Sequence, residues 1–373
     1  MKKFIYLLAA VFALTACNNE SEFTGPTDPV LISNGLFIVQ EGNINKHIDG
    51  SIGYYDYFAD KVDKDKFFSA NNIHLTGTIN DAVICGNNVY ILGTDEKTIY
   101  VADKNTMKWV GNIQLEIGGQ TFSPRHAVVD GDNIYVSTYE RKVIAINGTT
   151  NSIMETYDCG SYSEGLAVAD GYLYVANSDY GNGDASVSRI NLQSGVSENI
   201  KNGMMNNVVD VQVYGNRVFY LDSGTYLQEY PYTQENAGIY ELKSDGTSSF
   251  VTSATEMLIS GQMILGIDNP YSYPAKTPEY FIYNIETGSR DIFCSGKEIE
   301  SPSKISIDPL NSNVLITSRH NTSGYPSYDT PGYCAIYRIT NAGNGKYTGT
   351  YLGKFDCGVG PSYIIPNMNY VQW

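Results

Sequence analysis

The chain has 373 residues, 42% of them hydrophobic, and its 24 Lys and Arg against 40 Asp and Glu give a formal net charge of -16. Nucleic acids and anionic membrane surfaces attract basic proteins, so this balance argues against both as direct partners. No Pro/Gly/Ser-rich linker divides the chain, although its length exceeds that of a usual single core. These features together favour one architecture that grows by repetition.

The N-terminus has the order of parts found in an export signal. Met1 and two lysines precede the apolar run FIYLLAAVFAL (4–14), which is too short to span a membrane permanently, and LTAC (14–17) follows. This arrangement resembles a bacterial lipoprotein signal, and the alternative is an ordinary secretory signal cut nearby. We therefore expect residues 1–16 to be a signal peptide, Cys17 to be acylated, and 17–33 to be a polar flexible tether.

From residue 34 onward one short phrase recurs, in which an apolar alternation is followed by a tight Gly or Asn turn and a second apolar strand. Its clearest copies are AVICGNNVYILG (82–93), AVVDGDNIYVST (127–138), LAVADGYLYVAN (166–177) and VQVYGNRVFYLD (211–222). A period of about 40 to 50 residues with four strand-like runs per unit is typical of a β-propeller. An irregular β-sandwich is the alternative.

The repeats predict six complete blades and one divided blade. The innermost strands of the complete blades should begin near Asn80, Arg125, Glu164, Val209, Thr255 and Ser303. The runs GLFIVQ (35–40), SIGYYDYF (51–58) and 63–68 lack an inner strand, whereas GPSYIIP (360–366) lacks outer ones. We therefore predict an all-β, seven-bladed β-propeller over 34–373 whose ring is closed by the C-terminal strand.

Loop lengths distinguish the two faces of this ring. With strands A to D counted outward in each blade, the A–B and C–D turns share one face and are tight. The other face carries long B–C connections, which are residues 40–50, 177–185, 222–238, 268–279 and 318–332. Long loops on a rigid scaffold are commonly functional, so we place the binding surface on this second face.

Tyrosine dominates the aromatic residues, with 31 Tyr against 13 Phe and 2 Trp. Its flat ring and hydroxyl suit large amphipathic ligands or protein surfaces, although the same rings could simply pack the loops together. The candidate ligand-binding residues are Tyr180, Tyr226, Tyr230, Tyr271, Tyr273, Tyr325, Tyr328, His320, Arg125 and Tyr363.

Aligned inner strands also bring polar residues to the mouth of the central tunnel. They are Asn80, Asp81, Arg125, His126, Glu164, Asp210, Glu256, Lys304, Ser362 and Tyr363. Such a ring could hold a divalent metal, as in propeller lactonases, or could consist of solvated strand ends. Because HExxH, GxSxG and Cys–His arrangements are missing, we expect no enzyme, no catalytic residue, no metal and no cofactor.

The segment LFIVQEGNINKHIDGSIGYYD (36–56) resembles the start of YncE-like seven-bladed propeller lipoproteins of Bacteroidetes, which include the BtuG-type surface proteins. With the repeated phrases, the similarity covers nearly the whole mature chain. The resemblance implies an outer-membrane lipoprotein, facing the cell exterior, that binds cobalamin or another corrinoid and passes it to a TonB-dependent transporter. Two alternatives remain: a propeller that docks a protein or glycan through its tyrosines, and a metal-assisted lactonase or lyase.

Overall fold

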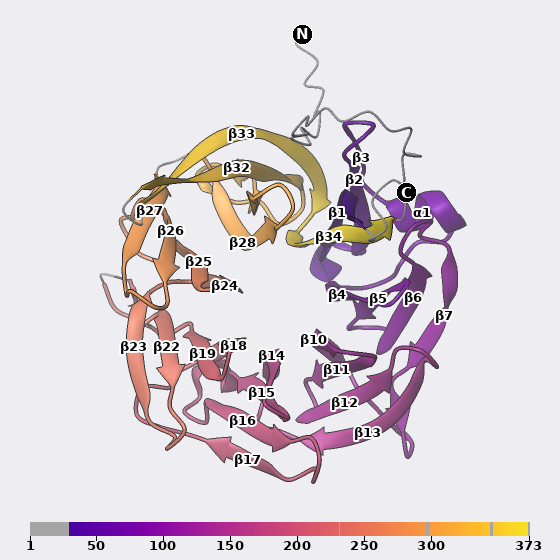
Figure 1. The fold of residues 1–373 in the computed structure, drawn as a ribbon, viewed down its shortest axis with the longest axis horizontal. Helices are drawn as coiled ribbons and strands as arrows, with labels where there is room; N and C mark the ends of the chain where they lie inside the picture. The colour runs from indigo at the N-terminus through magenta and orange to yellow at the C-terminus, as the bar shows by residue number, and fades with distance from the viewer. Residues whose placement is uncertain (1–29, 231, 296–297, 344–345, 372–373) are drawn as a thin grey trace, which may run out of the picture.

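The structure is a computed structural model that describes residues 30–230, 232–295, 298–343 and 346–371. Within these residues seven four-stranded antiparallel sheets surround a common axis (Figure 1). Strands β4, β10, β14, β18 and β24 lie nearest the axis, and β7, β13, β17 and β23 lie at the rim. The predicted all-β, seven-bladed propeller is therefore confirmed.

The sheets follow the sequence in order, each from its inner to its outer strand. The first three are β4 Ile79–Cys85, β5 Asn88–Gly93, β6 Thr98–Asp103, β7 Trp109–Gln114; β10 Pro124–Asp130, β11 Asn133–Thr138, β12 Lys142–Asn147, β13 Ser152–Asp158; and β14 Ser163–Ala169, β15 Tyr172–Asn177, β16 Ser186–Asn191, β17 Ser197–Ile200. The next three are β18 Val208–Tyr214, β19 Arg217–Asp222, β22 Gly238–Leu242, β23 Ser248–Ser253; β24 Glu256–Ser260, β25 Met263–Asp268, β26 Glu279–Asn284, β27 Arg290–Ser295; and β28 Ser301–Asp308, β29 Asn313–Arg319, β32 Pro331–Gly343, β33 Lys346–Val359.

The seventh blade joins the two ends of the described chain. Its strand order is β34 (Pro361–Val371), β1 (Val30–Gln40), β2 (Ser51–Asp56) and β3 (Lys61–Asp63). The C-terminal strand is innermost and pairs with β1, for example at Phe37 and Ile365, so the predicted ring closure is confirmed. Closure in this way leaves no unpaired inner edge at the junction.

Two details of this blade differ from expectation. Strand β1 begins at Val30 rather than at the expected boundary near residue 34, because β34 continues far enough to pair Val30 with Val371. The strand expected over 63–68 ends at Asp63, and the helix α1 (Lys66–Asn71) follows it. The Asp65 side chain starts this helix by accepting a hydrogen bond from the Phe68 amide. The expected signal peptide, Cys17 and most of the tether lie outside the described residues.

The remaining short elements are insertions between blade strands. They are η1 Ile44–Lys46, β8 Glu116–Ile117, β9 Gln120–Thr121, η2 Asp179–Gly181, β20 Thr225–Tyr226, β21 Gln234–Glu235, β30 Asn321–Thr322 and β31 Tyr325–Pro326. In the part of the chain that the structure describes, no helix is long and apolar enough to cross a membrane.

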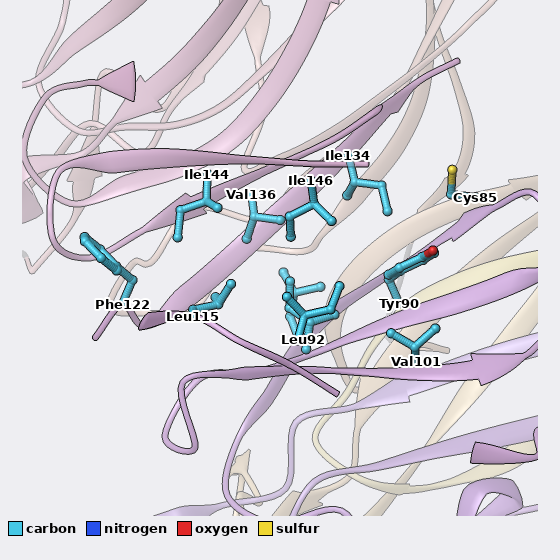
Figure 2. Close-up of a cluster of buried hydrophobic side chains, with 12 residues drawn as sticks. Cys85, Tyr90, Leu92, Val101, Leu115, Phe122, Ile134, Val136, Ile144 and Ile146 are labelled. Carbon is cyan, nitrogen blue, oxygen red and sulfur yellow. The ribbon is translucent and has the colours of Figure 1, made fainter. Parts of the chain in front are cut away.

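The hydrophobic core lies between neighbouring blades. In Figure 2, side chains of the β4 and β10 blades face each other, and Leu92, Val136 and Ile144 are fully buried. Each such side chain contributes about 1.5–3 kcal/mol on burial. The Tyr90 hydroxyl crosses between the same blades and donates a hydrogen bond to the Gly148 carbonyl at 2.6 Å. The apolar residues of the repeated phrase thus pack successive blades against one another.

The two faces differ as the loop lengths predict. The A–B turns are short, as at Gly131, whose φ of +57° suits the left-handed conformation of glycine. We call this side the plain face and the side with the B–C connections the insertion face. One hairpin departs from the pattern: β32 and β33 continue pairing to Gly343 and Lys346, beyond the last pair of β32 with β29 at Arg338.

Candidate functional site

The inner strands carry a local irregularity where they leave the insertion face. Among the described strands, β4, β10, β14, β18, β28 and β34 each show a register shift of the β-bulge kind in their first residues. A bulge inserts an unpaired residue and redirects the side chains beside it. At these positions lie Asp81, His126, Glu164 and Lys304, which the sequence placed at the tunnel mouth.

Together with Glu256, which lies on β24 where no such shift occurs, the redirected side chains form a mostly charged group that we call the tunnel ring. It consists of Asp81, Arg125, His126, Glu164, Asp210, Glu256, Lys304 and Tyr363. On one side of the ring, His126 lies 3.5 Å from a carboxylate oxygen of Asp81 and 3.5 Å from one of Glu164. Arg125 donates to the same Glu164 oxygen at 2.8 Å.

A second pair occupies the other side of the ring. The Lys304 ammonium lies 2.7 Å from Glu256 and 5.3 Å from the centre of the Tyr363 ring. Asp210 accepts hydrogen bonds from the Gln212 side chain and the Val211 amide, both at 2.8 Å. The carboxylates of this ring therefore have partners within the fold.

A glycine makes room for the Asp210 carboxylate. A β-carbon built on Gly165 would lie 2.0 Å from an oxygen of Asp210, far inside contact distance. The close approach of these two inner strands therefore requires glycine here.

Burial and pairing shift the pKa values in this ring. Burial alone would lower the pKa of His126, but hydrogen bonds and charges from Asp81 and Glu164 raise it to about 9. Burial raises the pKa of Asp210, against the effects of Gln212 and Lys304. Imidazolium is therefore the form of His126 that the folded ring favours.

In the described ranges, no group of three or more His, Cys, Asp or Glu side chains has an arrangement that could hold a metal ion. Beyond the ring, toward the plain face, the inner strands line a pocket of about 270 Å³ in which Val128, Leu166, Val168 and Ile259 lie beside Asp130 and Gln212. The tunnel thus carries charged side chains at one end and a mixed polar and apolar lining at the other.

Outside the tunnel, the long insertions of the β18 and β24 blades are joined to each other. The backbone amide of Gln234 donates to the Tyr271 carbonyl at 2.8 Å, and the backbone amide of Tyr273 donates to the Tyr232 carbonyl at 3.0 Å. The Gln234 side chain accepts from the Tyr271 amide at 2.9 Å and donates to the Ser223 carbonyl at 2.7 Å. The long loop of the β24 blade thereby extends the small hairpin β20–β21 of the β18 blade.

This joined pair of loops exposes a group of rings that we call the tyrosine cluster. Its members and their exposed fractions are Tyr226 (48%), Tyr230 (71%), Tyr232 (44%), Tyr271 (55%) and Tyr273 (59%). Four of these residues were candidates from sequence; Tyr232 lies in the same loop and was not among them.

A second pair of loops joins the β34 and β28 blades. The Asn43 side chain donates to the Tyr328 carbonyl at 2.8 Å, and Arg319 lies 3.1 Å from Glu41 and 5.1 Å from the centre of the Tyr328 ring. Gly42, between Glu41 and Asn43, has a φ of +72°. These contacts give the EGN phrase of the sequence a role in ring closure.

The two other candidates on this second pair of loops differ in their exposure and contacts. Tyr325 is 73% exposed. His320 lies 2.8 Å from a carboxylate oxygen of Glu300, so its ring is already engaged.

A third aromatic group lies at the tunnel mouth. Tyr180 lies against Tyr162 with 4.2 Å between ring centres, and Arg125 lies 4.5 Å from the centre of the Tyr139 ring. Sequence reasoning missed Tyr139 and Tyr162 because they occupy short connections, and attention to strand-end tyrosines would have found them. The candidates thus divide into three loop groups, with Tyr363 inside the tunnel.

Comparisons with known proteins support the fold. Residues 34–212 match the family model described as "Domain of unknown function (DUF5074)". No curated protein matches the chain.

Solved structures show the same architecture. Kuenenia stuttgartiensis hydrazine synthase is similar with a TM-score of 0.56 at 12% identity, covering 79% of this chain and 95% of that one. A functionally unknown protein from Desulfotomaculum acetoxidans DSM 771 also gives 0.56, at 13% identity, over 88% of this chain and 100% of that one. U3-55K gives 0.53 at 10% identity, over 75% and 81%. At these identities the similarity concerns the fold alone.

Proposed function

We propose that this propeller is a lipid-anchored binding protein whose insertion face takes a large amphipathic ligand, with cobalamin or another corrinoid as the candidate. The observation that carries the proposal is the set of exposed tyrosines on loops that hydrogen bonds hold in place. Exposed aromatic rings on an ordered surface give a large contact area at low entropic cost. Cobalamin itself enters through the resemblance of residues 36–56 to the BtuG-type lipoproteins.

Binding is favoured over catalysis by the difference between the ring and the loops. The acids and bases of the tunnel ring contact one another, as Arg125 and His126 contact Glu164. The tyrosine cluster instead presents its rings to solvent. A broad, amide-rimmed corrinoid fits a surface of this kind better than a side-chain pocket, and a non-covalent contact over many atoms can bind tightly without a metal bond.

The direction of β1 gives the anchor a geometric consequence. This strand starts at Val30, at its plain-face end, and runs to Gln40, which precedes the insertion loop 41–50. An acylated Cys17 would therefore connect to the ring at its plain-face end and would leave the insertion loops unobstructed. Such an attachment suits capture of a nutrient from outside and delivery to a TonB-dependent transporter beside it.

A titration with cyanocobalamin tests the ligand. Each of the substitutions Tyr226→Ala, Tyr230→Ala, Tyr271→Ala, Tyr273→Ala, Tyr325→Ala and Tyr328→Ala should weaken binding by about 0.5–1.5 kcal/mol and leave the melting temperature unchanged. Asp132→Ala and Ser194→Ala, in plain-face turns, are the controls. Absence of corrinoid binding would redirect the proposal to a protein or glycan ligand. Tight binding that survives loss of all six tyrosines would place the site elsewhere.

Labelling with palmitate tests the anchor separately. Cys17→Ala should abolish incorporation and release a soluble ring with unchanged cobalamin affinity, since the described propeller begins at Val30. Equal labelling of the variant and the unmodified chain would exclude Cys17 as the acylated residue.

A further inference from the structure

The three aromatic groups of the insertion face differ in what lies over their rings. Arg125 lies over Tyr139, and Arg319 lies over Tyr328. Among the described side chains, no Lys or Arg lies over a ring of the tyrosine cluster, although Lys276 belongs to one of its loops. The chain's own cations therefore use two of the aromatic groups and leave the third open.

The open rings are steeply inclined to one another. Tyr230 and Tyr232 have ring centres 6.3 Å apart and an interplanar angle of 87°, and Tyr230 and Tyr273 are 6.5 Å apart at 69°. A cation interacts favourably with a ring face within about 6 Å of its centre. Rings at these separations and angles can lie within that distance of one shared cation.

The charge of the surrounding loops has the complementary sign. The B–C connections hold ten acidic and four basic residues, a formal net charge of -6 for these connections, and the two loops of the tyrosine cluster contribute Glu229 and Glu235 against Lys276. These residues are Glu41, Asp49, Asp95, Glu96, Glu140, Asp179, Asp184, Glu229, Glu235 and Asp329, against Lys46, Lys97, Arg141 and Lys276. Such a field raises the local concentration of cations and repels anions.

We propose that the tyrosine cluster is a subsite for an organic cation, namely an alkylated ammonium group held against the tyrosine faces by cation–π attraction. Alkyl groups on the nitrogen favour contact with exposed rings, and quaternary ammonium ions are the ligands that aromatic cages recognise. This inference rests on the proposed function in placing a ligand on the insertion face, but it does not depend on that ligand being a corrinoid.

The test compares two probes of nearly equal shape and different charge. Choline carries a trimethylammonium group, and 3,3-dimethyl-1-butanol carries a neutral tert-butyl group in its place. Both are titrated into the full propeller, and binding is followed by the NMR shifts of the tyrosine ring protons. We expect choline to bind about two- to fivefold more tightly than the alcohol. Equal affinity, or no binding of choline, would overturn the proposal.

Variants locate the effect and separate ring chemistry from hydroxyl chemistry. Tyr230→Leu and Tyr273→Leu should abolish the preference for choline, whereas Tyr230→Phe should retain it because the ring quadrupole remains. Tyr325→Leu, an equally exposed tyrosine of the other joined loops, is the matched control and should keep the preference. A preference that persists in Tyr230→Leu and Tyr273→Leu, or disappears in Tyr325→Leu, would also reject the site.

The same samples separate this inference from the proposed function. Cobalamin binding without a choline preference would reject the cation subsite and leave the proposed function standing. A choline preference without cobalamin binding would support the subsite and reject the corrinoid.

Discussion

The tunnel ring and the tyrosine cluster lie on the same scaffold and have opposite relations to the fold. The ring contains the residue types that usually suggest chemistry, yet Glu164 contacts both His126 and Arg125. The cluster contains neutral side chains of which Tyr230 and Tyr273 are more than half exposed. The comparison teaches that the partners a side chain already has decide its availability to a ligand better than its residue type does.

The EGN phrase (41–43) and the residues around it are engaged within the fold, like those of the tunnel ring. Glu41 contacts Arg319 at the end of β29, and Asn43 contacts Tyr328 in the loop that follows. Gly50 lies so close to Ile79 that a β-carbon would be 2.7 Å from it. These residues hold the divided blade against its neighbours. The phrase therefore has a structural role in closing the ring.

Removal of residues 360–373 is expected to have the largest effect, because it takes away the inner strand of the divided blade. Strand β1 would lose its partner β34, and buried side chains such as Ile38 and Leu315 would lose their packing against Ile364. We expect a loss of more than about 5 kcal/mol and aggregation through the exposed edge, measured by thermal melting and size-exclusion chromatography. Tyr370→Ala, a 74% exposed position on the same strand, is the control and should melt normally. Normal melting of the truncated chain would contradict the closure.

Sequence could predict the ring because each blade repeats the same apolar runs and tight turns. The period of two places Tyr90 and Leu92 on one side of β5 and Val89 and Ile91 on the other, and both sides are buried because a blade packs against two neighbours. The bulges at Asp81 and His126 leave no mark in the alternation, so the contacts within the ring could not be derived. The joining of Gln234 to Tyr271 depends on two loops that meet only in three dimensions. Loop length predicted where a site lies but not which tyrosines share it.

The ring should also show its structural role when one charge is removed. Glu164→Leu leaves Arg125 and His126 without their shared carboxylate in a buried setting, for which we expect a loss of about 3 kcal/mol in chemical denaturation. Asp158→Ala breaks an exposed pair with Lys142, at a site where Asp158 is 82% exposed, and should cost less than about 1 kcal/mol. Equal losses would show that the ring pairs are no stronger than surface pairs.

The pH dependence of stability sharpens the same contrast. The pKa of His126 is raised to about 9 in the folded protein. Its contribution to the stability of the fold is therefore fully present below the unfolded pKa of about 6.5 and is lost as the pH rises through 9. We expect the free energy of unfolding to fall by on the order of 3 kcal/mol across this window. His126→Gln should remove this part of the slope. A profile that is identical in both proteins would contradict the raised pKa.

The smallest effect on stability should come from the loops, where Gln234→Ala separates the two halves of the tyrosine cluster. The substitution removes the side-chain contacts to Tyr271 and Ser223 and leaves the blade core untouched. Global unfolding should change by less than about 1 kcal/mol, since the lost hydrogen bonds are partly open to water. Amide hydrogen exchange at Tyr271 should accelerate, because that amide loses its acceptor.

Gln228→Ala is the matched control, in the same insertion and with only a 3.4 Å contact to the Tyr226 carbonyl. It should leave both exchange and ligand affinity unchanged. For Gln234→Ala we expect the affinity for cyanocobalamin to fall about two- to fivefold. Separated loops must be ordered when the ligand binds, which costs conformational entropy that the joined loops have already lost. Faster exchange with full affinity would mean that each loop positions its own tyrosines. Unchanged exchange would show that the backbone bridge between Thr233 and Ser272 joins the loops without Gln234.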